Sequence, residues 1–128
     1  MSDYLRDKNI VVTGGKGFLG SALIPKLHLK DCKKVTALDV NDYDFVHMKH
    51  VQRMYEELKP DIVIHLAAVV GGIGANMAHQ GEFFYKNLMM GVQLMEVGRL
   101  VNLEKFVALG TICAYPKFAS VPFKEEDL

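Results

Sequence analysis

The chain has 128 residues, half of them hydrophobic, and its 15 Lys and Arg residues balance 15 Asp and Glu residues. This length and composition predict one globular domain with a packed core. The zero net charge argues against a nucleic-acid binder, which normally carries a basic excess. No apolar run reaches about 18 residues, so we expect neither a transmembrane helix nor a membrane partner.

Two further features predict a cytoplasmic protein. Residues 1–8 lack the apolar core of a signal peptide. The two cysteines, Cys32 and Cys113, lie far apart in the sequence and form no CxxC pair. We therefore expect both to be reduced thiols, and we expect no metal site.

Apolar runs and helical periodicity alternate along the chain. Strands are expected at residues 9–13, 34–38, 61–66 and 105–109, and helices at 18–27, 48–58 and 82–102. A Gly-rich loop is expected at residues 70–75, and loop structure at 110–128. This alternation predicts an α/β fold, namely a truncated Rossmann-like, doubly wound parallel sheet of about four strands with helices on both faces. No internal domain boundary is evident, so residues 1–128 form one predicted unit.

A glycine-rich turn follows the first expected strand. Gly14, Gly17 and Gly20 form the pattern G-x-x-G-x-x-G, which ends an apolar run and opens a helical pattern. In this context the backbone can approach a diphosphate at the helix N-terminus. The alternative is a turn whose glycines serve packing alone.

An acidic residue strengthens the first interpretation. Asp39 ends the second strand, 19 residues after Gly20, where dinucleotide-binding folds place an acid against the adenosine ribose. Two roles are open for Lys16, which lies inside the turn. It could pair with a 2′-phosphate and so favour NADP, or it could be a solvated loop lysine. Asp39 would repel that phosphate and favours NAD. We favour NAD, because a lysine side chain can swing away.

Three other segments are candidates for the same crevice. Asp44-Phe45 can lie over the adenine edge, or be a turn aspartate and a core phenylalanine. Leu66-Ala67-Ala68 ends the third strand in small residues, which leave room for a ligand, whereas His65 is expected to be a core histidine. Thr111 and Cys113 follow the fourth strand at the same edge of the sheet, although such a pair is more often structural than catalytic.

These residues together resemble the extended short-chain dehydrogenase/reductase family of sugar-nucleotide epimerases and dehydratases. The general marks are Thr13-Gly14-Gly15-Lys16-Gly17-Phe18-Leu19-Gly20, Asp44-Phe45, His65-Leu66-Ala67-Ala68 and Asn87. More specific are Val70-Gly71-Gly72-Ile73-Gly74-Ala75-Asn76 and Leu109-Gly110-Thr111-Ile112-Cys113-Ala114-Tyr115-Pro116-Lys117, which are similar to members that act on GDP-sugars. The resemblance covers nearly the whole chain.

The resemblance implies both a cofactor site and a reaction. The implied cofactor-binding residues are Gly14, Lys16, Gly17, Phe18, Leu19, Gly20, Asp39, Asp44, Phe45, Leu66, Ala67, Ala68 and Asn87. In the implied reaction, a GDP-linked 4-keto-6-deoxymannose is epimerised at two ring carbons and reduced at C4 by hydride from NADPH. Thr111 matches the hydroxyl that polarises the ketone, and Cys113 matches the thiol implicated as acid and base in epimerisation. Asp39-Val40 stands where the family has a second cation for the 2′-phosphate, which leaves NAD and NADP both open.

The family's catalytic Tyr-x-x-x-Lys lies on the helix after the fourth strand, and this chain ends before it. Tyr4 with Lys8 and Tyr55 with Lys59 have the spacing, but we expect both to be coincidences. The 128 residues are therefore expected to be the N-terminal part of such an enzyme, without the substrate domain, binding dinucleotide but inactive alone. The alternatives are a stand-alone, non-catalytic dinucleotide-binding or sensor module and another nucleotide-sugar epimerase or dehydratase.

The helix expected at residues 82–102 carries more apolar surface than one sheet face can hide. Core burial, with methionines filling gaps, is one explanation. The other is a homodimer interface, because enzymes of the family that the sequence resembles commonly pair through this helix.

Overall fold

The computed structural model describes residues 3–128; Met1 and Ser2, part of the stretch used to argue against a signal peptide, lie outside it. Its regular elements are β1 (Asn9–Thr13), α1 (Phe18–His28), β2 (Lys34–Leu38), α2 (Met48–Leu58), β3 (Ile62–His65), α3 (Ile73–Ala78), α4 (Gln80–Leu100) and β4 (Lys105–Ala108). Short 3-10 helices are η1 (Asp3–Leu5), η2 (Ile112–Ala114) and η3 (Glu125–Asp127). The four strands lie at the positions that the apolar runs predict.

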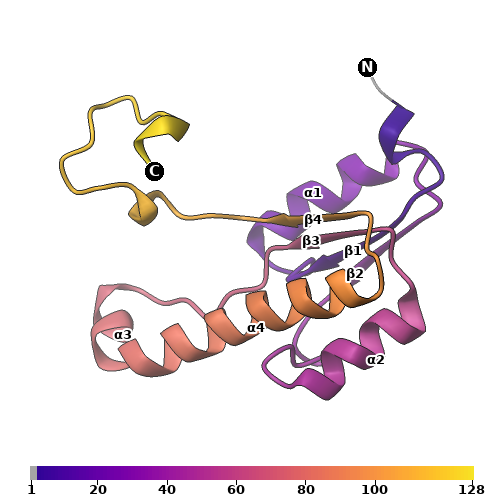
Figure 1. Ribbon diagram of the computed structural model, residues 1–128, viewed down its shortest axis with the longest axis horizontal. Coiled ribbons are helices and arrows are strands. Elements are labelled where there is room, and N and C mark those ends of the chain that lie inside the picture. Colours follow the sequence, from indigo (N-terminus) through magenta and orange to yellow (C-terminus); the bar gives the residue numbers. More distant parts are fainter. Residues whose placement is uncertain (1–2) are drawn as a thin grey trace.

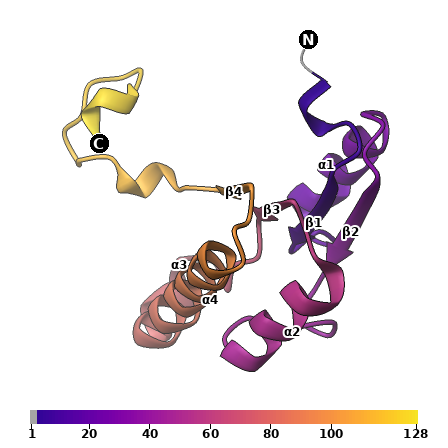
Figure 2. The same cartoon turned by 45° about the vertical axis from the view of Figure 1, so that its right-hand side comes forward.

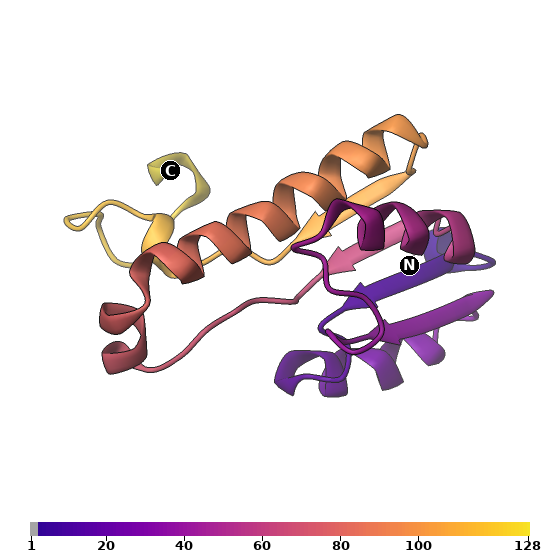
Figure 3. The ribbon, with the colours of Figure 1, turned by 90° about the horizontal axis from the view of Figure 1, so that it is seen from below.

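The strands form one parallel sheet in the order β2-β1-β3-β4. Helix α1 covers one face, and α2 and α4 cover the other (Figure 1), which a view from below also shows (Figure 3). The chain leaves β1 toward β2 on one side and returns to β3 on the other, so a topological switch point lies between β1 and β3. This arrangement confirms the predicted Rossmann-like α/β fold.

Two hydrophobic cores hold these layers together. Successive residues of a strand point to opposite faces, so Ile10 and Val12 of β1 pack on the α1 side and Val11 packs on the other. The larger core lies between the sheet, α2 and α4, and it includes the fully buried Met54 and Leu94. Both faces of the central strands are therefore covered, which explains why these strands are apolar almost throughout.

One expected loop is partly helical. Residues 70–75 were expected to be a loop, but α3 begins at Ile73. The Asn76 side chain donates hydrogen bonds to the carbonyls of Gly71 (2.6 Å) and Gly72 (3.1 Å), which fastens the first turn of this helix to the residues before it. Helix α4 then begins at Gln80, two residues earlier than expected.

Residues 109–128 leave the sheet after β4 and extend beyond it (Figures 1 and 2). Most of their side chains are exposed, and β4 is an edge strand of the four-stranded sheet. Within residues 3–128, none of the helices combines the length and hydropathy needed to cross a membrane. The same residues contain no group of three or more His, Cys, Asp or Glu side chains arranged to hold a metal ion.

Candidate functional site

The turn between β1 and α1 depends on its glycines. Gly14 has a φ of +65°, and a Cβ there would lie 2.7 Å from the Ala67 nitrogen. A Cβ at Gly20 would lie 2.3 Å from the Gly15 carbonyl oxygen. Glycine at these positions therefore lets the turn pack against the segment after β3 and lets α1 pack against the turn.

The N-terminus of α1 is open. Its N-cap is Gly17, with no side-chain cap hydrogen bond and no acidic residue in the first turn. The first N–H groups of a helix have no partner within the helix, and they favour an anion. This end of α1 is therefore suited to hold a diphosphate, which is the group that the glycine pattern predicts.

A cavity of about 1150 Å³ opens in front of this turn. It lies at the carboxyl ends of β1, β2 and β3, beside the switch point, where ligands bind in open α/β sheets. Predicted site residues that line it are Gly14, Lys16, Gly17, Phe18, Leu19, Asp39, Asp44, Phe45, Leu66, Ala67 and Ala68. Its size, its glycine cradle and the open helix end fit a dinucleotide.

Further lining residues were not anticipated from the sequence. They are Val40, Asn41, Tyr43, Val46, His47, Val69, Val70, Lys86 and Met90. Most belong to the loop after β2 or to the segment after β3. They could have been found from the sequence by extending the predicted site a few residues past the end of each strand. Lys86 and Met90 come from α4, and the helical periodicity alone gave no signal that this part of α4 faces the crevice.

Lys16 is held between two acids at one end of the cavity. Its Nζ lies 3.0 Å from Asp39 Oδ2 and 2.7 Å from Asp42 Oδ2. The hydrogen bonds to Asp42 and Asp39 raise the pKa of Lys16. The hydrogen bond from Lys16 is the largest cause that lowers the pKa values of Asp39 and Asp42. Hydrogen bonds from backbone N–H groups lower both pKa values further. The lysine is thus neither freely solvated nor swung away from Asp39.

Asp44 and Phe45 combine the two roles considered for them. Asp44 Oδ1 accepts the Val46 N–H at 3.1 Å, as a turn aspartate does. Phe45 is 3% exposed and stacks on Tyr43, so it is a core residue. Both also line the cavity.

His65 was expected to be a core histidine, but it is only half-buried at the end of β3 and is satisfied by a hydrogen bond. Its Nδ1 lies 2.7 Å from the hydroxyl of Thr13, a fully buried residue that also accepts the Ala67 N–H at 3.3 Å. Burial lowers the pKa of His65, which favours the neutral ring. The pair ties the end of β1 to the end of β3, directly behind the cavity wall.

Asn87 and Gly20 belong to the predicted site but do not line the large cavity. The Asn87 side chain accepts the Val69 N–H at 2.8 Å and donates to the Val69 carbonyl at 2.9 Å. Asn87 therefore fixes the segment after β3, part of the cavity wall, from the side of α4. Gly20 supports the turn through its close packing on Gly15.

The structure does not bring Thr111 and Cys113 into this cavity. Both are exposed on the segment after β4, where the Thr111 hydroxyl accepts the Cys113 N–H at 3.2 Å. Cys32 and Cys113 are free thiols. Neither Tyr-x-x-x-Lys pair contributes a residue to the cavity lining. Tyr55 is buried, with its hydroxyl donating to the Leu94 carbonyl at 2.9 Å.

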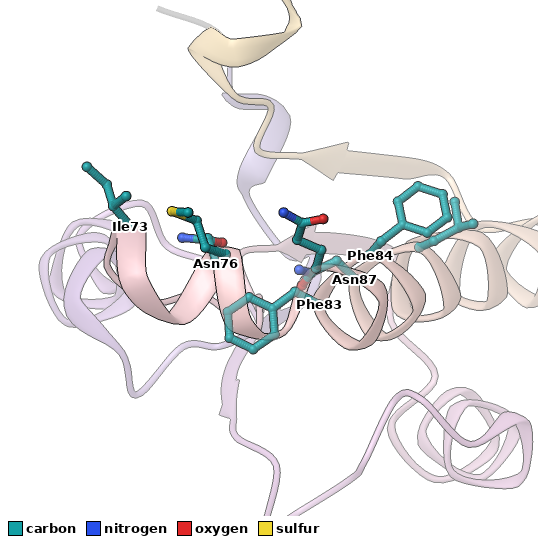
Figure 4. Close-up of a pocket in the computed structure, with 8 residues that line it drawn as sticks. Ile73, Asn76, Phe83, Phe84 and Asn87 are labelled. Carbon is teal, nitrogen blue, oxygen red and sulfur yellow. The ribbon is translucent and has the colours of Figure 1, made fainter.

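A second, more open hollow of about 730 Å³ lies between α3 and the start of α4 (Figure 4). Ile73 and Asn76 of α3 and Phe83, Phe84 and Asn87 of α4 are among its lining residues. Asn87 thus stands between the two hollows, with its amide turned to Val69.

The fold and the crevice define a Rossmann-like α/β domain with a ligand cavity at its switch point. The chain belongs to the NAD dependent epimerase/dehydratase family, whose sequence profile matches residues 10–128. This confirms the resemblance carried by the glycine turn and the segments after β3 and β4.

Individual relatives support this membership. A GDP-L-fucose synthase from Sinorhizobium fredii is 40% identical over 129 residues, which cover all of this chain and 41% of that protein. A GDP-L-colitose synthase from Yersinia pseudotuberculosis is 32% identical over 108 residues, or 84% of this chain and 35% of its own length. The structure of a GDP-mannoheptose C4 reductase from Campylobacter jejuni with NADP bound has a TM-score of 0.87 and 30% identity, covering all of this chain and 40% of that one. The chain thus spans about two-fifths of the length of these proteins.

Proposed function

We propose that this chain is the cofactor-binding part of a nucleotide-sugar epimerase/reductase, similar to the GDP-L-fucose synthases. The observation that carries the proposal is the cavity in front of the β1–α1 turn, where a glycine cradle, an open helix N-terminus and Asp39 converge. The relatives named above act on GDP-sugars, which supports a GDP-sugar as the substrate class.

Each part of the cavity has a role in this proposal. The N–H groups at the start of α1 hold the diphosphate, and Asp39 accepts hydrogen bonds from the adenosine ribose. Ala67 and Ala68 leave room for the nicotinamide half beside the end of β3. When bound, the cofactor supplies the hydride for reduction of a sugar ketone. NAD is favoured over NADP, since Asp39 lines the cavity while Lys16 is already paired.

Thr111 and Cys113 take the chemical roles in this proposal. The Thr111 hydroxyl donates to the ketone oxygen at C4 and stabilises the negative charge that develops there. The Cys113 thiol moves protons at the two ring carbons that are epimerised, giving a 3,5-epimerisation before reduction at C4. Because both side chains are exposed in the structure, they are accessible to a sugar. The family's Tyr-x-x-x-Lys is not found after β4 in this sequence, so we propose no turnover by these 128 residues alone.

Direct titration tests cofactor binding. We expect NADH, followed by its own fluorescence and by calorimetry, to bind saturably with a Kd below about 1 mM. Ala68→Leu puts a larger side chain into the cavity wall and should raise this Kd about tenfold or more, since a filled cavity excludes the ligand. Ala22→Leu makes the same change at an exposed position of α1 outside the cavity and should leave the Kd unchanged. If neither NADH nor NADPH binds at millimolar concentration, the proposed function fails.

A homodimer through α4 is a second part of the proposal. The exposed face of this helix carries Phe84, Leu88, Val92 and Met95, spaced by four, four and three residues. This spacing forms a continuous apolar stripe, and large exposed stripes of this kind are typical of interfaces. A second copy of the chain, with the same stripe on its own α4, would cover it in a symmetric contact between the two α4 helices.

Light scattering after size exclusion tests the dimer. We expect the unsubstituted protein to have the mass of two chains. Val92→Glu should reduce the measured mass to that of one chain, because burying a carboxylate without a partner costs free energy. Lys49→Glu, which adds a carboxylate on the exposed start of α2, is the control and should remain dimeric. A clean monomer at high concentration of the unsubstituted protein rejects this interface.

A further inference from the structure

Three side chains from two loops meet at the adenosine-ribose end of the cavity. Lys16 comes from the β1–α1 turn, and Asp39 and Asp42 come from the loop that starts at the end of β2. Lys16 and Asp39 line the cavity, while Asp42 lies behind them. With one ammonium and two carboxylates in contact, the group carries one net negative charge.

Asp42 is itself firmly placed. Its Oδ2 accepts the backbone N–H of Asp39 at 2.9 Å in addition to Lys16 Nζ. Its backbone carbonyl accepts a hydrogen bond from the Arg53 guanidinium at 3.2 Å, and its N–H donates to the Asp39 carbonyl at 3.2 Å. The Asp42 carboxylate is therefore positioned to hold the Lys16 ammonium against Asp39.

This arrangement bears on the one position where NAD and NADP differ. NADP carries a phosphate, with between one and two negative charges, where NAD has a ribose hydroxyl. A phosphate needs donors, and Lys16 Nζ and the Asp39 N–H are two donors at this end of the cavity. Both already donate to one oxygen of Asp42. Without the Asp42 charge, Lys16 and Asp39 would form a neutral pair, and the ammonium would be free to turn toward a phosphate.

We propose that Asp42 is a specificity-determining positioning residue: by holding Lys16 against Asp39, it makes this cavity select NAD over NADP. The inference rests on the proposed function, because it requires a dinucleotide in the cavity. It goes beyond the acid at the end of β2, since Asp42 acts on the cofactor through Lys16 and does not line the cavity itself.

The test measures binding of NADH and NADPH to the same set of variants by calorimetry. Asp42→Asn keeps an oxygen that can accept the Asp39 N–H and removes the charge, so it should lower the Kd for NADPH about tenfold and leave the Kd for NADH essentially unchanged. Asp42→Ser should give the same shift through a different side chain. Asp31→Asn removes the same charge beyond the C-terminal end of α1, away from the cavity, and should shift neither Kd.

A double substitution tests the route through Lys16. In a Lys16→Gln background, Asp42→Asn should lose most of its effect on NADPH, because the ammonium that it releases is gone. An undiminished effect in that background, or equal changes for both nucleotides, overturns the positioning role. If the unsubstituted protein binds both nucleotides and the ratio of their Kd values does not respond to Asp42, this inference fails while the proposed function stands. If the unsubstituted protein binds neither nucleotide, both fail.

Discussion

Gly20→Ala is expected to lower the free energy of unfolding by about 3 kcal/mol. An added Cβ would lie 2.3 Å from the carbonyl oxygen of Gly15 and 2.5 Å from its carbonyl carbon and Cα. These are backbone atoms of the turn, so no side-chain rotation can relieve the overlap. Helix α1 would have to move away from the turn, which would also displace the open N–H groups at its start. Urea denaturation followed by circular dichroism measures the loss, and NADH titration measures the effect on the cavity.

Gly91→Ala is the matched control, because Gly91 also lies inside a helix, α4. A Cβ there would meet no atom within 4 Å. Alanine favours the helix over glycine by about 0.5–1 kcal/mol, so this variant should be slightly more stable than the unsubstituted protein. The same chemical change is thus expected to act in opposite directions at the two sites. If both substitutions change the free energy of unfolding equally, close packing of Gly20 on Gly15 is not what requires glycine at position 20.

The features that the sequence predicted well are those that depend on neighbouring residues. The four strands are short apolar runs, and the glycine turn stands directly between a strand and a helix. Parallel strands then bring their carboxyl ends to one edge. For this reason, Asp39 and Ala67, 28 positions apart in the sequence, could be expected at the same crevice, and both line it.

Features that depend on side-chain direction could not be predicted. The sequence sets Lys16 and Asp39 in opposition as indicators of NADP and NAD, but the structure joins them in one ion cluster through Asp42, a residue that looked like part of a simple turn. Asn87 was expected at the cofactor, and its amide instead bonds to the backbone of Val69, 18 residues earlier. Thr111 and Cys113 follow β4 in the sequence, as expected, yet neither of them lines the cavity.

Leu94→Ala is expected to lower the free energy of unfolding by about 3 kcal/mol. Leu94 is 0% exposed and packs in the core between the sheet, α2 and α4. Truncation removes its buried methyl groups and leaves a cavity, and the small gain in helix propensity from alanine does not offset this loss. Its backbone carbonyl also accepts the Tyr55 hydroxyl, so movement of α4 to fill the cavity would strain that bond. The shift of the urea midpoint, at constant m value, measures the effect.

Leu88→Ala makes the same change six residues earlier on the same helix, where the side chain is 47% exposed. In the monomer it should cost less than about 1 kcal/mol, because little packing is lost. At concentrations where two copies pair through α4, the same variant should lower the stability of the dimer, since Leu88 belongs to the exposed stripe. Leu94→Ala should lower the free energy of unfolding equally at low protein concentration, where the chain is monomeric, and at high concentration, where two copies pair. The two variants therefore distinguish two groups of apolar residues on α4. One group packs against the sheet, and the other would pack against a second copy of the chain. If Leu88→Ala behaves alike at low and high concentration, the stripe is not an interface, and only the Leu94 face contributes to stability.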